Sequence, residues 1–194
     1  MKPIHYAVPL VLCLAAWAYA GDAARYPNGI EGLRCGSAPP PGLYLRSYNL
    51  YYHASDLKDK NGDVIDLDFG LDAFASANRV IWITDITQKA LGCDYGVYGI
   101  LPFQYTDIEM GKLGIDDDRI RVGDISIGPA LFSWHKPRFD LAVAYEIFIP
   151  TGDYHRGEPG TPGKEYFTHM FTFGATGYLD KEKTWTFSIL PRYE

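Results

Sequence analysis

The residues able to do acid–base or nucleophilic chemistry are scattered along this chain of 194 residues. Beyond the N-terminal segment, the histidines lie far apart: His53, His135, His155 and His169. No Gly-x-Ser-x-Gly or His-Glu-x-x-His pattern accompanies them. A hydrolase would need histidine, hydroxyl and acid side chains to converge, as His155 with Thr161 or His169 with Thr172 could. Histidines in loops or at interfaces are the simpler interpretation, so the sequence predicts no catalytic residue and no enzyme.

Metal-ligand patterns are equally weak. Asp59-Lys60-Asn61-Gly62-Asp63 resembles the start of a calcium loop, but the glycine and the closing glutamate are not in place. Asn61-Gly62 is better interpreted as a turn, and Asp116-Asp117-Asp118 as part of a solvated loop. Cys35 and Cys93 lack metal-ligand spacing, although two thiols in an exported chain could form one disulfide. We expect neither a metal nor a cofactor.

Six acids follow a more regular pattern, because each occupies the polar face of an alternating segment. In residues 65–81 the apolar side chains fall on odd positions, interrupted only by Arg79. The acids on the opposite faces of this and two later segments are Asp66, Asp68, Asp72, Asp94, Asp140 and Glu146. Carboxylates face hydrocarbon only at high cost, so we expect these six to line an interior. A hydrated or salt-bridged interior with Arg46 and Arg192 is the first interpretation, and a substrate-selective acidic lining is the second.

The elements that must position these residues are strands with a side-chain period of two. The strands expected from the alternation are Leu43–His53, Val64–Trp82, Leu91–Thr106, Ile120–Trp134, Phe139–Ile149, Phe167–Leu179 and Thr184–Tyr193. The fourth changes face near Gly128-Pro129, which predicts a bulge. Several of these segments are longer than ordinary strands, and they suit tilted strands that cross a bilayer.

The connections alternate in length. Ala54–Asp63, Asp107–Arg119 and Pro150–Tyr166 are long and polar, whereas His135–Arg138 and Asp180–Lys183 are tight. Short turns on one side and longer loops on the other are typical of outer-membrane barrels. The sequence therefore predicts an all-β, antiparallel transmembrane β-barrel. Because the expected strands are odd in number, we also expect this chain to be the N-terminal part of a larger barrel.

Three tryptophans lie at the ends of expected strands next to the shorter connections. They are Trp82, Trp134 and Trp185. Tryptophans gathered at one level predict an interfacial girdle, and ordinary strand-end aromatic residues are the alternative.

The N-terminal residues predict export. A positive start at Lys2, a mostly apolar Val8–Trp17 and a small-x-small site at Ala18-Tyr19-Ala20 predict a signal peptide over residues 1–20. Residues 21–42 form a leader rich in Gly, Ala and Pro, periplasmic or luminal, and residues 43–194 carry the barrel strands. A net charge of −6 disfavours nucleic acid as a partner.

Several short motifs resemble the meta-pathway phenol-degradation family of outer-membrane proteins. They are Tyr26-Pro27-Asn28-Gly29-Ile30-Glu31-Gly32, Pro39-Pro40-Pro41-Gly42, Asn78-Arg79-Val80-Ile81-Trp82, Leu91-Gly92-Cys93-Asp94-Tyr95-Gly96, Gly123-Asp124-Ile125, Ser133-Trp134-His135, Pro150-Thr151-Gly152-Asp153-Tyr154 and Thr184-Trp185. The resemblance implies an outer-membrane barrel, linked to aromatic catabolism, that helps hydrophobic substrates across. Its expected partners are outer-membrane lipid, small hydrophobic or aromatic solutes and the barrel-assembly machinery.

Passive transport of such solutes is therefore the leading hypothesis. A secreted soluble β-sandwich or β-barrel that binds a ligand is the second, because apolar outward faces could instead be buried between sheets. A membrane-embedded barrel enzyme is the third.

Overall fold

The computed structural model describes residues 25–26, 29–155 and 161–194. The chain divides into two units between Ile30 and Glu31, and the second unit, residues 31–194, carries the fold described below. The signal peptide predicted for residues 1–20 lies outside the described residues, as do positions 21–24 and 27–28 of the predicted leader. Among the residues described, no helix has the length and apolar character needed to span a bilayer.

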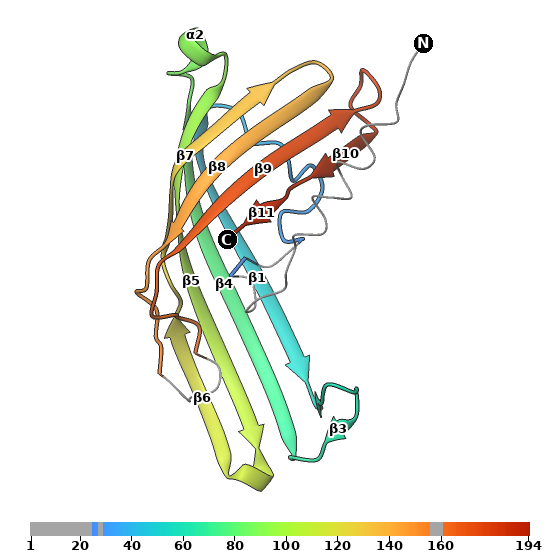
Figure 1. The fold of residues 1–194 in the computed structure, drawn as a ribbon, viewed down its shortest axis with the longest axis vertical. Helices are drawn as coiled ribbons and strands as arrows, with labels where there is room; N and C mark the ends of the chain where they lie inside the picture. Colours follow the sequence, from blue (N-terminus) through green and yellow to red (C-terminus); the bar gives the residue numbers. More distant parts are fainter. Residues whose placement is uncertain (1–24, 27–28, 156–160) are drawn as a thin grey trace. The chain divides into compact units, whose positions relative to one another are not determined.

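In the described part of the second unit, nine strands form one antiparallel sheet. They are β1 (Gly42–Ala54), β4 (Phe69–Thr84), β5 (Asp94–Met110), β6 (Ile115–Val122), β7 (Ser126–His135), β8 (Phe139–Phe148), β9 (Thr168–Tyr178), β10 (Thr186–Ile189) and β11 (Arg192–Tyr193). The main order is β1-β4-β5-β7-β8-β9-β10, with β6 on β5 and β11 on β9. The sheet is strongly curled (Figure 1). Its strands are antiparallel, which confirms the predicted all-β antiparallel fold.

Short elements join these strands. A separate hairpin pairs β2 (Leu57–Lys58) with β3 (Val64–Ile65), a one-turn helix α2 (Gln88–Leu91) precedes β5, and a 3-10 turn η2 (Gly111–Leu113) joins β5 to β6. Figure 1 shows α2 at one end of the sheet and the β5–β6 hairpin at the other. We call these the α2 end and the loop end.

The largest difference from the expected elements lies at the loop end. Residues 107–119 were expected to form a loop, but β5 continues to Met110 and β6 begins at Ile115, with Met110 opposite Ile115. Gly114 has a φ of 64°, which lets the chain reverse tightly there. Arg121 donates a hydrogen bond to Asp117 and lowers the pKa of its carboxyl, so the acids of this segment are tolerated within a strand.

The bulge predicted near Gly128-Pro129 is confirmed. The pairing of β7 with β5 shifts register between the pairs Gly96–Leu131 and Tyr98–Gly128. The pairing of β7 with β8 shifts register between Ile127 and Ala130. The Tyr98 ring packs directly on Gly128, where a Cβ atom would lie only 2.2 Å from the ring carbon Cζ. The extra residue resets the alternation of β7, which explains why its sequence changes face.

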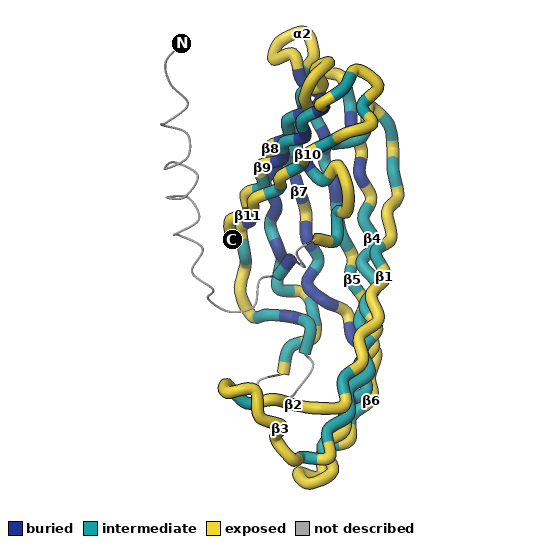
Figure 2. Tube along the Cα trace, turned by 90° about the vertical axis from the view of Figure 1, so that its right-hand side faces the viewer, coloured by how far each residue is buried: buried dark blue, intermediate teal, exposed yellow. Residues whose placement is uncertain are grey.

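Buried and less buried residues alternate along β8 and β9 (Figure 2), so the two faces of the sheet differ in burial. We call inner the face on which Tyr98, Glu146 and Met170 are buried, and outer the face on which Phe173 and Val143 are exposed. Partners in antiparallel strands share a face, and the pairing of β4 with β5 runs from Phe69 to Thr84 without a break. It therefore extends these faces across β4.

This pairing reverses the face expected for the second strand. Ile81 pairs with Tyr98 and is buried on the inner face, whereas Trp82 and Val80 are exposed on the outer face. Odd-numbered residues of β4 therefore lie inward rather than toward lipid. Alternation shows that two faces exist, but it identifies the inner one only when the residues differ strongly in polarity, and the odd face of β4 is apolar.

Replacing Gly128 with alanine tests the contact beneath the bulge. The added Cβ would collide with the Tyr98 ring, so we expect Gly128→Ala to lower the free energy of unfolding by about 1–3 kcal/mol. Gly70→Ala is the matched control, because the nearest atom to its Cβ would be 3.9 Å away. Chemical denaturation of the full-length protein measures both, and equal stabilities would contradict this packing.

Candidate functional site

Residues 31–41, which we call the leader segment, reach the inner face through Glu31. Its carboxylate accepts hydrogen bonds from Arg46 of β1 and Arg79 of β4, both at 2.9 Å, and forms an ion pair with Arg192 of β11 at 3.4 Å. The Tyr48 hydroxyl donates a further bond at 2.9 Å. The Glu31 side chain is only 10% exposed, so this one carboxylate joins strands from both ends of the described sheet in a partly dehydrated cluster.

The rest of the leader segment packs closely on β9. A Cβ on Gly36 would lie 2.4 Å from the backbone of Ala175, so only glycine allows this approach. Ser37 Oγ lies 3.4 Å from the Tyr178 hydroxyl, and Arg34 donates to the carbonyl of Lys183 at 2.8 Å. The leader is therefore held on the inner face by backbone packing as well as by charge.

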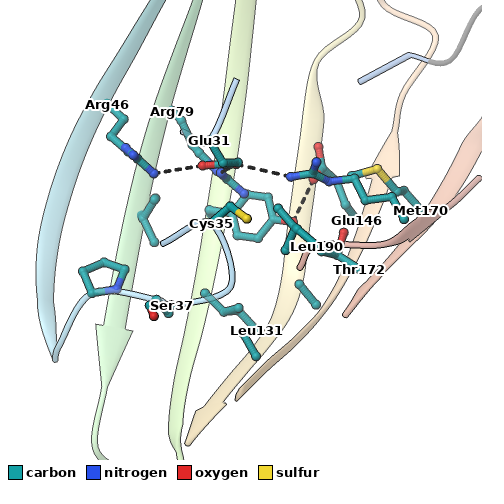
Figure 3. Close-up of a pocket in the computed structure, with 17 residues that line it drawn as sticks. Glu31, Cys35, Ser37, Arg46, Arg79, Leu131, Glu146, Met170, Thr172 and Leu190 are labelled. Atoms are coloured by element: carbon teal, nitrogen blue, oxygen red, sulfur yellow. Dashed lines mark hydrogen bonds and ion pairs between the residues drawn. The ribbon is translucent and has the colours of Figure 1, made fainter. Parts of the chain in front are cut away.

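A pocket opens between the leader segment and the inner face. Figure 3 shows Glu31 and Cys35 between the strands that carry Arg46 and Arg79 and those that carry Glu146 and Met170. Much of its wall is apolar and comes from Ala38, Ile81, Leu131, Ala142, Ala144 and Leu190. Charged and polar side chains also line it, including Glu31, Arg46, Arg79, Glu146, Thr172 and Arg192, so the pocket combines apolar walls with several charged groups.

Glu146 is the most deeply buried acid of the pocket. It is 1% exposed and accepts a hydrogen bond from the Tyr98 hydroxyl at 2.7 Å through Oε2. Its other oxygen, Oε1, has no hydrogen-bond partner among the described residues. Arg79 lies 4.2 Å from the centre of the Tyr98 ring, so a cation sits close to this carboxylate and offsets part of the cost of burying it.

Asp94 and Asp140 also lie on the inner face, at the α2 end. His135 Nδ1 is 3.2 Å from Asp140, and its Nε2 is 3.8 Å from Asp94. Gln88 donates to Asp94 at 2.6 Å, and the Tyr178 hydroxyl donates to Asp140. Both acids therefore have local partners, although Asp140 Oδ1, which lies near His135, accepts no hydrogen bond among the described residues.

The remaining three acids of the expected lining lie elsewhere. Asp66 pairs with Lys112 at the loop end with its side chain 80% exposed, and Asp68 stands in a turn with a φ of 49°. Asp72 is on the outer face, where Tyr51 and His53 contact its carboxylate. Asp72 was expected on the inner face because the sequence assigned β4 the opposite register, whereas Asp66 and Asp68 precede β4 and lie outside the strand.

The inner face also has an uncharged strip, which the sequence did not predict because it assigned the odd-numbered residues of β4 to the outer face. Toward the loop end from Arg46 and Arg79, the inward positions of β1 and β4 are Tyr48, Leu50, Tyr52, Ala54, Ala77, Ala75, Ala73 and Leu71. We call these eight residues the inner strip. Arg79 was the available signal, because a charged residue on a supposed lipid face argues that this face points inward.

The three tryptophans expected to form a girdle all lie at the α2 end of the sheet. Trp82 is 56% exposed on the outer face, and Trp185 is 71% exposed. Trp134 pairs with Leu141 on the same face, and its indole N–H donates to the carbonyl of Leu91 at 3.3 Å. Their role as an interfacial girdle stays a prediction.

The sequence-based alternatives for the cysteines and histidines can be checked directly. Cys35 and Cys93 are both free, so the possible disulfide is not formed. His169 lies on the outer face beside Tyr145, whereas Thr172 lines the inner pocket, so these two residues do not form a catalytic pair. Within the described ranges, no group of three or more His, Cys, Asp or Glu side chains could hold a metal ion.

The model of a family described as "Putative MetA-pathway of phenol degradation" matches residues 54–194. An outer-membrane channel from Pseudomonas putida F1 has a similar structure, with a TM-score of 0.61 and 18% sequence identity. The match covers 82% of this chain and 57% of that channel, so the chain spans little more than half of its length. Among curated proteins, no sequence matches.

Replacing Glu31 tests the ionic cluster. Glu31→Gln removes the charge that Arg46, Arg79 and Arg192 share, and we expect a loss of about 3–5 kcal/mol of stability in the leader's attachment. Cleavage by trypsin after Arg34, measured on the folded full-length protein, should become much faster. Glu109→Gln, at an exposed position of β5, is the control and should leave cleavage unchanged. If both variants are cleaved at the wild-type rate, the cluster does not hold the leader.

Proposed function

Because this chain belongs to the MetA-pathway phenol-degradation family, as the motifs of its sequence indicated, we propose that it acts in the outer membrane as a passive channel for small hydrophobic or aromatic molecules. The observation that carries the proposal is the uncharged inner strip, which leads from the loop end toward the pocket beneath the leader segment. The fold, shared with an outer-membrane channel, supports the location.

The inner strip suits a neutral solute. Alanines at positions 73, 75 and 77 leave room beside β4, while Leu50 and Leu71 offer apolar contact. A neutral aromatic molecule gives up little hydration on such a surface, whereas an anion would leave water without gaining a charged partner. The Tyr48 and Tyr52 hydroxyls add polar groups that a phenol-like solute can use.

The outer face supports placement in lipid. On β8 and β9 its exposed residues are apolar over several successive positions, including Val143, Phe171 and Phe173. A soluble ligand-binding protein, the second hypothesis, would have to leave these side chains in water or cover them with another layer. A bilayer accounts for them directly.

The ionic cluster of Glu31 with Arg46, Arg79 and Arg192 lies along the proposed path. A solute that leaves the inner strip meets Arg46 and Arg79, whose charges Glu31 partly neutralises. The pocket next to them offers the buried carboxylate of Glu146 and apolar walls. We propose that the leader segment narrows the lumen here and that solutes pass the pocket before they leave at the α2 end.

A transport assay tests the proposal. Liposomes with the full-length protein should take up phenol several times faster than benzoate, because the inner strip offers the anion no compensation. Ala75→Asp puts a charge in the middle of the strip and should lower phenol uptake about fivefold. Ala75→Ser, which is nearly as small and neutral, is the matched control and should stay close to wild type.

Two results would refute this function. One is a protein in liposomes that accelerates neither solute. The other is a protein that takes up benzoate faster than phenol and keeps this preference unchanged in the Ala75→Asp variant. Separately, release of the protein by salt or osmotic shock would favour the soluble binding protein over the channel.

A further inference from the structure

The outer face of β1 and β4 carries polar residues at a level where the other strands are apolar. Ser47 and Asn49 of β1 stand opposite Asn78 and Ser76 of β4 in the pairing register. We call these four residues the Ser/Asn patch. On β5, the next strand, the residues opposite Asn78 and Ser76 are Leu101 and Phe103, so the polar surface ends there.

The patch lies in the middle of the span that the proposed membrane location implies. Toward the α2 end it is flanked by Leu45, Val80 and Trp82, and toward the loop end by Tyr51 and Phe74. All five flanking side chains are exposed on the outer face. Aromatic residues at both limits of an apolar band mark the two interfaces of a barrel, which places the patch at the depth of the hydrocarbon core.

The hydrogen-bonding capacity of the patch is only partly used. Asn49 donates to Ser47 Oγ at 3.4 Å, and Asn78 donates to Ser76 Oγ at 3.3 Å. Both bonds are long, and each amide keeps its carbonyl oxygen and a second N–H without a partner among the described residues. Lipid tails cannot accept or donate hydrogen bonds, so these groups require a polar neighbour.

We propose that the Ser/Asn patch is a contact surface for a second copy of this chain. Copies inserted in the same direction present the patch at the same depth. The four side chains are neutral, and each hydroxyl and amide both donates and accepts, so the surface is complementary to itself. Leu45, Val80 and Phe74 surround it with apolar surface that can pack across such an interface.

The chemistry of the patch favours this occupant over others. It holds no charged side chain, so a charged partner would gain no counter-ion there. On β8 and β9 the exposed outer side chains include Val143 and Phe173, which suit lipid and indicate that only one side of the sheet meets a protein. The inference rests on the proposed outer-membrane location but not on the identity of the solute.

Photo-crosslinking in intact outer membranes tests the contact. Two full-length copies with different affinity tags are expressed together, with p-benzoylphenylalanine in place of Asn49. We expect a product that carries both tags, at least tenfold more abundant than when the same residue replaces Phe173. The Phe173 position is the matched control, because it is also exposed on the outer face within a strand.

A second measurement distinguishes a specific contact from crosslinking of copies that collide at random in the membrane. Asn49→Leu with Asn78→Leu should lower the co-purification of the second tag about tenfold, whereas Phe173→Leu should leave it unchanged. Heat-dependent gel mobility reports that each variant has folded.

Folded protein in the outer membrane that gives no two-tag product above the control, or gives only lipid or single-tag products, would overturn the inference while leaving the channel intact. Unaltered co-purification in the double variant would also overturn it. Protein that never reaches the outer membrane would overturn both the inference and the proposed function.

Discussion

The backbone pairing of β4 with β5 is the constraint on which the rest of this structure depends. It runs without a break from Phe69 to Thr84, and the pairing of β1 with β4 continues it. Because strand side chains alternate with a period of two, one fixed pair determines the face of every other residue in the three strands. Tyr98 is buried and Phe103 is exposed, so Arg79 must lie inward and Asn78 outward. The ionic cluster, the inner strip and the Ser/Asn patch all follow from this register.

Given this register, Glu31 links strands from the two sides of the sheet and forms part of the pocket wall. Strand twist and the bulge in β7 give the sheet part of its curvature. Glu31 adds a direct link, because it ties β1 and β4 to β11 through three arginines. The three cations repel one another in a partly dehydrated space, and the carboxylate makes their approach favourable. Gly36 lets the leader's backbone touch β9, so the same short segment sets the distance between the two sides and forms one wall of the pocket.

The sequence predicted the architecture better than the lining. Alternation predicted most of the strand residues and the bulge at Gly128, because the period of two and the loss of phase are local properties of the chain. It did not predict the strand segments within residues 107–119 or the breaks inside several of the expected strands. It did not predict which face of β4 points inward, because Ala73, Ala75 and Ala77 suit lipid and an apolar lumen equally well. The site around Glu31 was also beyond local reasoning, since its partners are separated by 15, 48 and 161 positions in the chain. The charge of Arg79 on an apolar face pointed to it, and the sequence had also placed the cations Arg46 and Arg192 in the interior.

The reversed face of β4 changes the physical character of the proposed lumen. Had Asp66, Asp68 and Asp72 lined it, repulsion of anions by a long acidic surface would decide selectivity. With these acids at the loop end or on the outer face, the acids of the expected lining that remain inside have local partners such as His135 or lie buried near Arg79. In the proposed channel, selectivity against anions would then come from the uncompensated loss of hydration along the inner strip rather than from repulsion. Repulsion between exposed charges weakens as salt is added, whereas the hydration lost on an uncharged surface depends little on ionic strength. A preference for neutral solutes that persists at high salt is therefore what this lining implies.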